Sequence, residues 1–197
     1  MNKQIIFSVA VAVALIGGAF YLSSLKNSEE SIFIGSANQA FAAKFETLST
    51  NGNSSCSGGF KDSIADMPDD ARLQGSCCSP MSLHRYTEQV EGLEKFKSIA
   101  SQNIDKIPDD PYDIEGKLAK ELLSYYDMEL TPEEQKAYDY AMLNSSEKGP
   151  CCCKCWRWYT YGGLGKYLIK NHSFTGEQLT EVWDLSDGCG GDEEHKH

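Results

Sequence analysis

The chain has 197 residues, of which 41% are hydrophobic, and its 29 acidic residues outnumber its 18 Lys and Arg residues, giving a formal net charge of −11. This length fits one domain, or one domain with appendages. A nucleic-acid-binding protein needs a basic face to neutralise phosphates, so the charge balance predicts no nucleic-acid partner.

Residues 5–22 contain no charged side chain. As a helix, this run is about 27 Å long, close to the hydrocarbon thickness of a bilayer. A secretory signal has a shorter apolar core with a small-x-small cleavage site just after it, and no such site follows Leu22 closely. No cysteine that could carry a lipid precedes Cys56. We therefore predict that residues 1–26 are an uncleaved membrane anchor rather than a cleaved signal.

Charges on either side of this run predict its orientation. Lys3 precedes the run, whereas Lys26 is followed by Glu29 and Glu30. The positive-inside rule then places the N-terminus in the cytoplasm. We expect a single-pass membrane protein whose C-terminal domain lies outside the cytoplasm, where disulfides persist.

Composition divides the remaining chain into three parts. Residues 27–72 include a stretch rich in Gly, Ser and Asn, which predicts a flexible tether. Residues 73–191 carry helical periodicity and seven of the eight cysteines, and are predicted to form a cysteine-rich helical domain. Residues 192–197 are predicted to be a disordered acidic and histidine-containing tail.

Helix signals recur along residues 73–191, and no convincing alternating strand pattern is present. The fold class predicted is all-α, an N-terminal transmembrane helix followed by a small helical bundle. Five helices are expected. The first begins at Ser79-Pro80 and ends before the turn at 107–111, and the second spans 114–126. The third begins at a capping box at Thr131, the fourth runs from Pro150 toward Lys170, and the fifth begins at a second capping box at Thr175.

Four cysteines fall within residues 151–155. Core packing does not require such a cluster, whereas soft-metal binding and disulfide exchange both use closely spaced thiolates. In a helix, Cys151 and Cys152 would each share a face with Cys155. In an extended segment, Cys151, Cys153 and Cys155 would alternate onto one side. Either conformation brings two or three sulfurs together.

Three further cysteines flank the predicted helices. Cys77 and Cys78 precede the first, and Cys189 follows the last. The start of one helix and the end of another can meet at one end of a short bundle, which would gather seven sulfurs, with a nearby thioether and imidazole. The predicted metal ligands are Cys77, Cys78, Cys151, Cys152, Cys153, Cys155, Cys189, Met81 and His84.

Thiolate ligands favour Cu(I) or Zn²⁺, and we expect copper first and zinc second. Two alternatives stay open: a thiol-disulfide oxidoreductase with Cys78 or Cys155 as the reactive thiol, and a structural or partner-binding domain stapled by disulfides. Adjacent cysteines bridge each other only with strain, which argues against a full disulfide framework. The sequence offers no Ser-His-Asp set, paired-carboxylate site or phosphate loop, so nothing in it supports hydrolase chemistry.

Residues 150–155 match the pattern P-C-x-C-x-C. The chain thereby resembles bacterial membrane-attached proteins named for a P-C-Y-C-G-C motif, with Cys152 and Lys154 in place of the Tyr and Gly. Those proteins are extracytoplasmic, cysteine-rich and of unknown biochemical function, so the resemblance implies location and thiol chemistry. It implies Cys151, Cys153 and Cys155 as the matched thiols. Members of that family are typically lipid-anchored, whereas residues 1–26 of this chain are predicted to be a transmembrane anchor.

Overall fold

A computed structural model describes residues 39–54, 60–99 and 104–189. The predicted membrane anchor and the predicted tail lie outside the described residues. Within the described ranges, no helix combines the length and the apolar character needed to cross a bilayer. The chain divides into two units, Met1–Lys44 and Phe45–His197. In the first unit the described residues, 39–44, are helical.

The second unit is mostly helical, as predicted. Residues 45–51 are helical, and the elements that follow are α2 (Phe60–Ala65), β1 (Arg72–Gln74), α3 (Leu83–Ile99), β2 (Asp113–Glu115), α4 (Gly116–Ser124), α5 (Pro132–Asn144), α6 (Trp156–His172) and α7 (Gly176–Ser186).

The prediction that the chain lacks strands is wrong. β1 and β2 pair antiparallel, with Leu73 opposite Ile114. Both of these side chains are buried, and Arg72 forms ion pairs with Asp113 and Glu115 at 2.6 and 3.2 Å. Each strand has only three residues, which is too short for an alternating pattern to stand out in the sequence.

The two capping boxes are confirmed. The side chain of Thr131 accepts a hydrogen bond from the backbone N–H of Glu134 at the start of α5, and Thr175 accepts one from Gln178 at the start of α7. The N3 side chain returns a bond to the N-cap backbone in both cases. Each cap satisfies amides that have no partner within the helix.

Two helices begin later than predicted. α3 starts at Leu83 rather than at Pro80, and Leu83 is exposed. α6 starts at Trp156 rather than at Pro150, so the cysteine cluster precedes the helix as a series of bends. Freed from helical geometry, residues 150–155 can turn several sulfurs toward one point.

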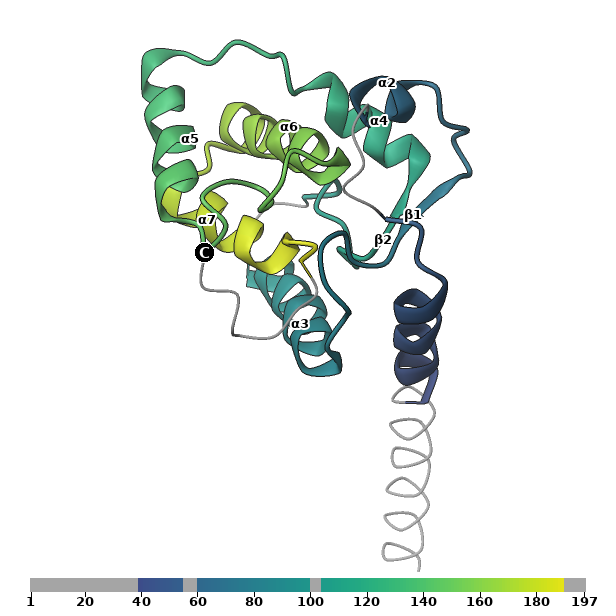
Figure 1. The fold of residues 1–197 in the computed structure, drawn as a ribbon. Coiled ribbons are helices and arrows are strands. Elements are labelled where there is room, and N and C mark those ends of the chain that lie inside the picture. Colours follow the sequence, from purple (N-terminus) through teal and green to yellow (C-terminus); the bar gives the residue numbers. More distant parts are fainter. Residues whose placement is uncertain (1–38, 55–59, 100–103, 190–197) are drawn as a thin grey trace, which may run out of the picture. The chain divides into compact units, whose positions relative to one another are not determined.

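Helix α6 lies at the centre of the second unit. In Figure 1 it runs between α5 on one side and α4 on the other, with α7 and α3 below. Leu164 and Leu168 of α6 are fully buried, and the core also contains Leu122 from α4, Ala141 from α5 and Trp183 from α7. The N-terminus of α6, where the cysteines lie, is therefore held by packing along the whole helix.

The compact unit extends further toward the N-terminus than the predicted boundary at residue 73. Leu48 and Ile64, from the predicted tether, are only 2% and 1% exposed. The ring of Phe45 lies 5.6 Å from that of Tyr86. These apolar side chains are isolated among polar residues in the sequence, so they show little periodicity, yet they cover the core.

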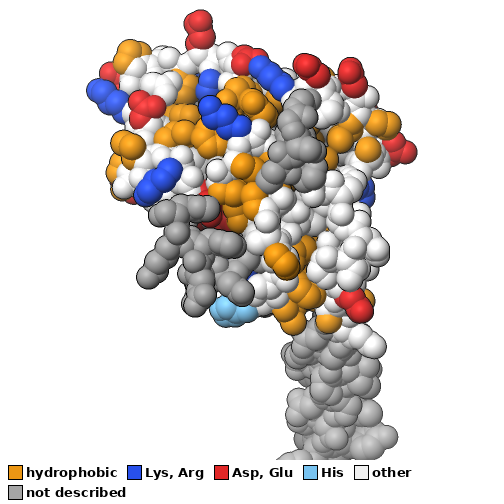
Figure 2. All heavy atoms as spheres, viewed as in Figure 1, with side chains coloured by type: hydrophobic (Ala, Val, Ile, Leu, Met, Phe, Trp, Pro, Cys, Tyr) orange, Lys and Arg blue, Asp and Glu red, His pale blue; other side chains and the backbone are white. Residues whose placement is uncertain are grey.

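Charged side chains of both signs are dispersed over the surface. On the described part of the face shown in Figure 2, basic side chains are separated from one another by acidic, polar and apolar ones. A mixed surface of this kind is typical of a solvated protein.

Candidate metal centre

Three loops converge to form a cluster of sulfur atoms. Cys77 and Cys78 lie between β1 and α3, residues 151–155 lie between α5 and α6, and Cys189 follows α7. Among the described residues, no disulfide joins any two of these seven cysteines. Cys56, the eighth, lies outside the described residues. The backbone N–H of Cys77 donates to Gly188 O at 2.9 Å, which joins the first loop to the third.

Four sulfurs form a group, here called the tetrad, in which every Sγ lies within 4.8 Å of every other. The members of the tetrad are Cys77, Cys151, Cys153 and Cys155. The Sγ of Cys151 is 3.7 Å from that of Cys77 and 3.6 Å from that of Cys155. Four sulfurs bound tetrahedrally at a metal–sulfur distance of about 2.3 Å lie about 3.8 Å apart. The two Sγ–Sγ contacts that Cys151 makes within the tetrad are therefore close to the spacing of a tetrahedral metal site.

The tetrad reaches from the interior toward the surface. Cys151 and Cys155 are 0% and 1% exposed, whereas Cys77 and Cys153 are partly exposed. Cys155 is the N-cap residue of α6, so the positive end of the helix dipole lies at this thiol. Thiolates are favoured at such positions.

A second set of sulfurs lies beside the tetrad. The Sγ of Cys152 is 3.1 Å from that of Cys78 and 2.8 Å from that of Cys189. Cys78 is also 3.6 Å from Cys153 and 3.5 Å from Cys77. The seven sulfurs thus form one continuous cluster rather than separate sites.

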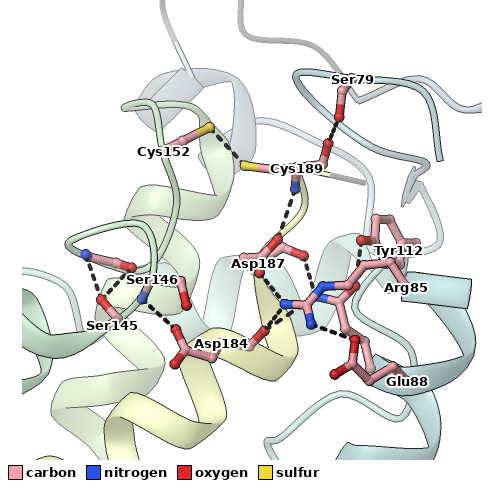
Figure 3. Close-up of polar contacts among 12 residues, drawn as sticks. Ser79, Arg85, Glu88, Tyr112, Ser145, Ser146, Cys152, Asp184, Asp187 and Cys189 are labelled. Carbon is pink, nitrogen blue, oxygen red and sulfur yellow. Dashed lines mark hydrogen bonds and ion pairs between the residues drawn. The ribbon is translucent and has the colours of Figure 1, made fainter. Parts of the chain in front are cut away.

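Cys189 is held in place by polar contacts to Ser79, in the loop before α3, and to Asp187, the C-cap residue of α7, as Figure 3 shows. Its backbone N–H donates to Asp187 Oδ1 at 3.3 Å, and its carbonyl accepts a bond from Ser79 Oγ. Asp187 in turn pairs with Arg85 at 2.8 Å, and burial raises the pKa of Asp187 despite this pairing. Cys189 therefore has a defined position although it follows the last described helix.

Arg157 places a positive charge beneath the cluster. The side chain is 0% exposed and lies over the ring of Trp156 at 4.5 Å and that of Tyr112 at 5.3 Å. Its guanidinium donates to the carbonyls of Gly75, at 2.7 Å, and of Pro111. Among the described residues, no carboxylate is bonded to it, and its Nε has no hydrogen-bond partner.

The charge of Arg157 is balanced in part by the thiols. Burial opposes the charged form, but attraction to Tyr161, Cys77 and Cys151 raises the pKa of the guanidinium overall. A Cβ placed on Gly188 would lie 1.9 Å from Arg157 Nε, so the backbone before Cys189 packs directly on this cation. A buried cation of this kind favours negative charge on the sulfurs.

Several neighbouring thiols lie within hydrogen-bonding distance of the Cys151 thiol, with Sγ–Sγ distances of 3.7 Å to Cys77 and 3.6 Å to Cys155. Hydrogen bonding from Cys152, and then from Cys155, Cys189 and Cys77, lowers the pKa of the Cys151 thiol. The pKa values of those four donors are raised, in each case chiefly by the bond to Cys151.

The two non-cysteine ligand candidates are placed differently. His84, in the first turn of α3, is exposed and belongs to none of the metal-competent groups among the described residues. Met81 is partly exposed in the loop before α3. The structure gathers the seven predicted cysteines and leaves His84 outside.

Sequence reasoning missed three polar residues beside the sulfurs. Arg157 lies within an aromatic run of the sequence. A carboxylate oxygen of Glu147, one of Asp187 and the Sγ of Cys189 all lie within 4.8 Å of one another. Acidic residues are frequent in this chain, and no spacing distinguishes these two. The position of Arg157, two residues after Cys155, was the only available signal.

Comparison of the chain with protein-family models, with curated proteins and with solved structures finds no match.

Proposed function

We propose that this protein binds a soft metal ion, copper first and zinc second, through its cysteine cluster, and that it does so outside the cytoplasm while anchored to the membrane by residues 1–26. The uncharged run at residues 5–22 supports the location. The resemblance of residues 150–155 to the extracytoplasmic P-C-Y-C-G-C proteins supports it too.

The observation that carries the proposal is the convergence of seven cysteine sulfurs from three loops. Core packing has no need of seven sulfurs at one point, because a buried thiol behaves as a small apolar group. Thiolates instead select soft ions such as Cu(I) and Zn²⁺. The Sγ–Sγ contacts of Cys151 within the tetrad, which are close to tetrahedral spacing, and the buried charge of Arg157 both suit a thiolate-bound cation.

Metal analysis of the full-length protein, purified in detergent under reducing conditions, tests this proposal. We expect bound copper or zinc, and a higher Tm after addition of Cu(I) or Zn²⁺ to the metal-free protein. A free ligand concentration one hundred times Kd stabilises the folded state by about 2.7 kcal/mol. For a chain of this size, that corresponds to a rise in Tm of about 5–11 °C.

Two variants make the test specific. Cys151→Ser removes the most buried thiol and should abolish most of the rise in Tm, whereas His84→Ala should leave the rise unchanged. The proposal would be contradicted if the purified protein contained no metal and its Tm did not rise with either ion. Circular dichroism of each metal-free variant checks that it is folded.

Thiol-disulfide exchange is a second candidate function, favoured by the exposure of Cys78. This thiol is exposed and lies 3.1 Å from the Sγ of Cys152, so an attacking and a resolving sulfur are within reach of each other. An oxidoreductase requires Cys78 to alkylate faster than free cysteine near neutral pH. Slow alkylation of Cys78, together with bound metal in the same sample, would favour the metal site.

A further inference from the structure

Six of the seven sulfurs are arranged as two facing triangles. The inner triangle, which belongs to the tetrad, consists of Cys77, Cys151 and Cys153. The outer triangle, in which every two sulfurs lie within 4.8 Å of each other, consists of Cys78, Cys152 and Cys189.

Each edge of the outer triangle lies against one corner of the inner triangle. This gives three combinations, in each of which the three sulfurs lie within 4.8 Å of one another. The edge Cys78–Cys189 lies against Cys77, the edge Cys78–Cys152 against Cys153, and the edge Cys152–Cys189 against Cys151. Two triangles joined in this way are the two opposite faces of an octahedron. The inner triangle and these three combinations are alternate faces of it.

This arrangement has a consequence for metal binding. When metal ions occupy four alternate faces of an octahedron of thiolates, each ion has three sulfur ligands and each sulfur bridges two ions. Three sulfurs around one ion at about 2.3 Å lie about 4.0 Å apart. The shortest Sγ–Sγ contacts within the cluster are 2.8 to 3.7 Å, so these sulfurs would move outward to reach this spacing.

We infer that the cluster binds about four Cu(I) ions in one cage of bridging thiolates, rather than a single ion. This inference rests on the proposed function. Cys155 belongs to the tetrad alone, so it adds a fourth, terminal ligand to the ion on the inner triangle, whereas each of the other three ions has three sulfur ligands. The thiols that ligate copper release their protons to the solvent, and copper remains Cu(I) throughout.

Coordination preference makes this cage a copper site. Cu(I) is a soft ion that accepts three thiolate ligands, whereas structural Zn²⁺ is almost always bound by four ligands. Only the tetrad supplies four sulfurs among the described groups, and the other three combinations supply three. The cluster should therefore hold about four Cu(I) ions but only about one Zn²⁺ ion per chain.

Charge also fits the cage. Seven thiolates and four monovalent ions leave a net charge of −3, from −7 and +4. Arg157 is buried beneath the cluster with no carboxylate bonded to it among the described residues, and the N-terminus of α6 adds partial positive charge at Cys155. Together these two features supply about +1.5, which offsets about half of the excess negative charge.

Titration of the reduced, metal-free, full-length protein tests the inference. Cu(I) is added in the presence of a competing Cu(I) chelator, Zn²⁺ is added to a separate sample, and native mass spectrometry counts the bound ions. In the copper titration, we expect the metal-free form to convert directly to a form with about four Cu(I) ions, with little of the intermediate forms. In the zinc titration, we expect a form with about one Zn²⁺ ion. X-ray absorption of the copper form should contain a Cu–Cu scattering path.

Two matched Cys→Ser variants separate bridging from terminal sulfurs. Cys155→Ser should keep about four Cu(I) ions but lose the Zn²⁺ site. Serine is a favoured N-cap residue, so α6 should still form in this variant. Cys152→Ser removes a sulfur shared by two combinations, and should lose about two Cu(I) ions while keeping the Zn²⁺ site in the tetrad.

The outcomes distinguish the inference from the proposed function. One Cu(I) per chain, or stepwise filling without a Cu–Cu path, overturns the cage but leaves soft-metal binding intact. No binding of either ion overturns both. Equal loss of copper in the two variants also overturns the assignment of bridging and terminal sulfurs.

Discussion

Arg157 is a fully buried cation that contacts aromatic rings, two backbone carbonyls and the underside of a thiol cluster. Taking a charge out of water costs several kcal/mol, and this cost is recovered only through hydrogen bonds and opposite charge. The carbonyls of Gly75 and Pro111 supply the bonds. Metal-bound thiolates would supply the opposite charge, so this residue links the stability of the fold to the state of the cluster.

Replacing Arg157 by methionine tests this role. The side chain keeps much of its length, but the two carbonyls lose their donors, which we expect to lower the free energy of unfolding of the metal-free protein by about 2 kcal/mol. Loss of the charge should also weaken Cu(I) binding on the order of tenfold, or about 1.4 kcal/mol. Urea unfolding and chelator competition measure the two effects.

Lys154→Met is the matched control for Arg157→Met. Lys154 is also a cation within the cluster region, but it is exposed. Its replacement should change either quantity by less than about 0.5 kcal/mol. Similar weakening of copper binding by both variants would show that charge near the sulfurs acts without regard to burial.

At the scale of elements, the close packing of α4 against α6 positions the cluster. A Cβ on Gly163 would lie 1.9 Å from the carbonyl oxygen of Leu122 in α4, a distance that no side-chain movement can relieve. The two helices can therefore approach only because residue 163 is glycine. Since Cys155 caps α6, any displacement of this helix also displaces the tetrad.

Gly163→Ala should therefore destabilise the protein, although alanine is the better helix former by about 1 kcal/mol. We expect a loss of about 2 kcal/mol in the free energy of unfolding, as is usual for overpacking. At the neighbouring Gly162, a Cβ would meet ring carbons of Tyr126 at 3.0 Å, and these can move. Thermal unfolding should show a clearly smaller loss for Gly162→Ala, and equal losses would contradict this account of the α4–α6 contact.

At the scale of the whole molecule, the compact unit begins well before the first described cysteine. Leu48 is 2% exposed, and Trp156 Nε1, adjacent to the cluster, donates to Ser54 Oγ at 3.2 Å. Part of the segment that the sequence suggested was a tether thus packs on the compact unit next to the cysteine cluster.

Leu48→Ala in the full-length chain measures this contribution. Truncation of a buried leucine typically costs 2–5 kcal/mol, and we expect about 3 kcal/mol here. Leu143→Ala is the matched control, because Leu143 is 72% exposed and should cost less than about 0.5 kcal/mol. Urea unfolding provides both values, and a negligible effect of Leu48→Ala would place this residue outside the cooperative unit.

The sequence by itself determined the helical class and the two capping boxes. These features are local, since a cap depends on residues three apart and a helix face on residues three or four apart. The sequence also indicated the chemistry open to the seven cysteines, because clustered thiols typically bind soft metals or exchange disulfides. The sequence did not indicate how the sulfurs are arranged in space, since local spacing allowed residues 150–155 to be either helical or extended.

Tertiary structure decided what depends on distant parts of the chain. The start of α6 at Trp156, the burial of Leu48 and the charge of Arg157 beneath the sulfurs all arise from contacts between segments tens of residues apart. The short β1–β2 pair arises in the same way, since three-residue strands are stable only when the rest of the fold brings them together. The two triangles of sulfurs exist only because three loops end at one point, and no local pattern encodes that meeting.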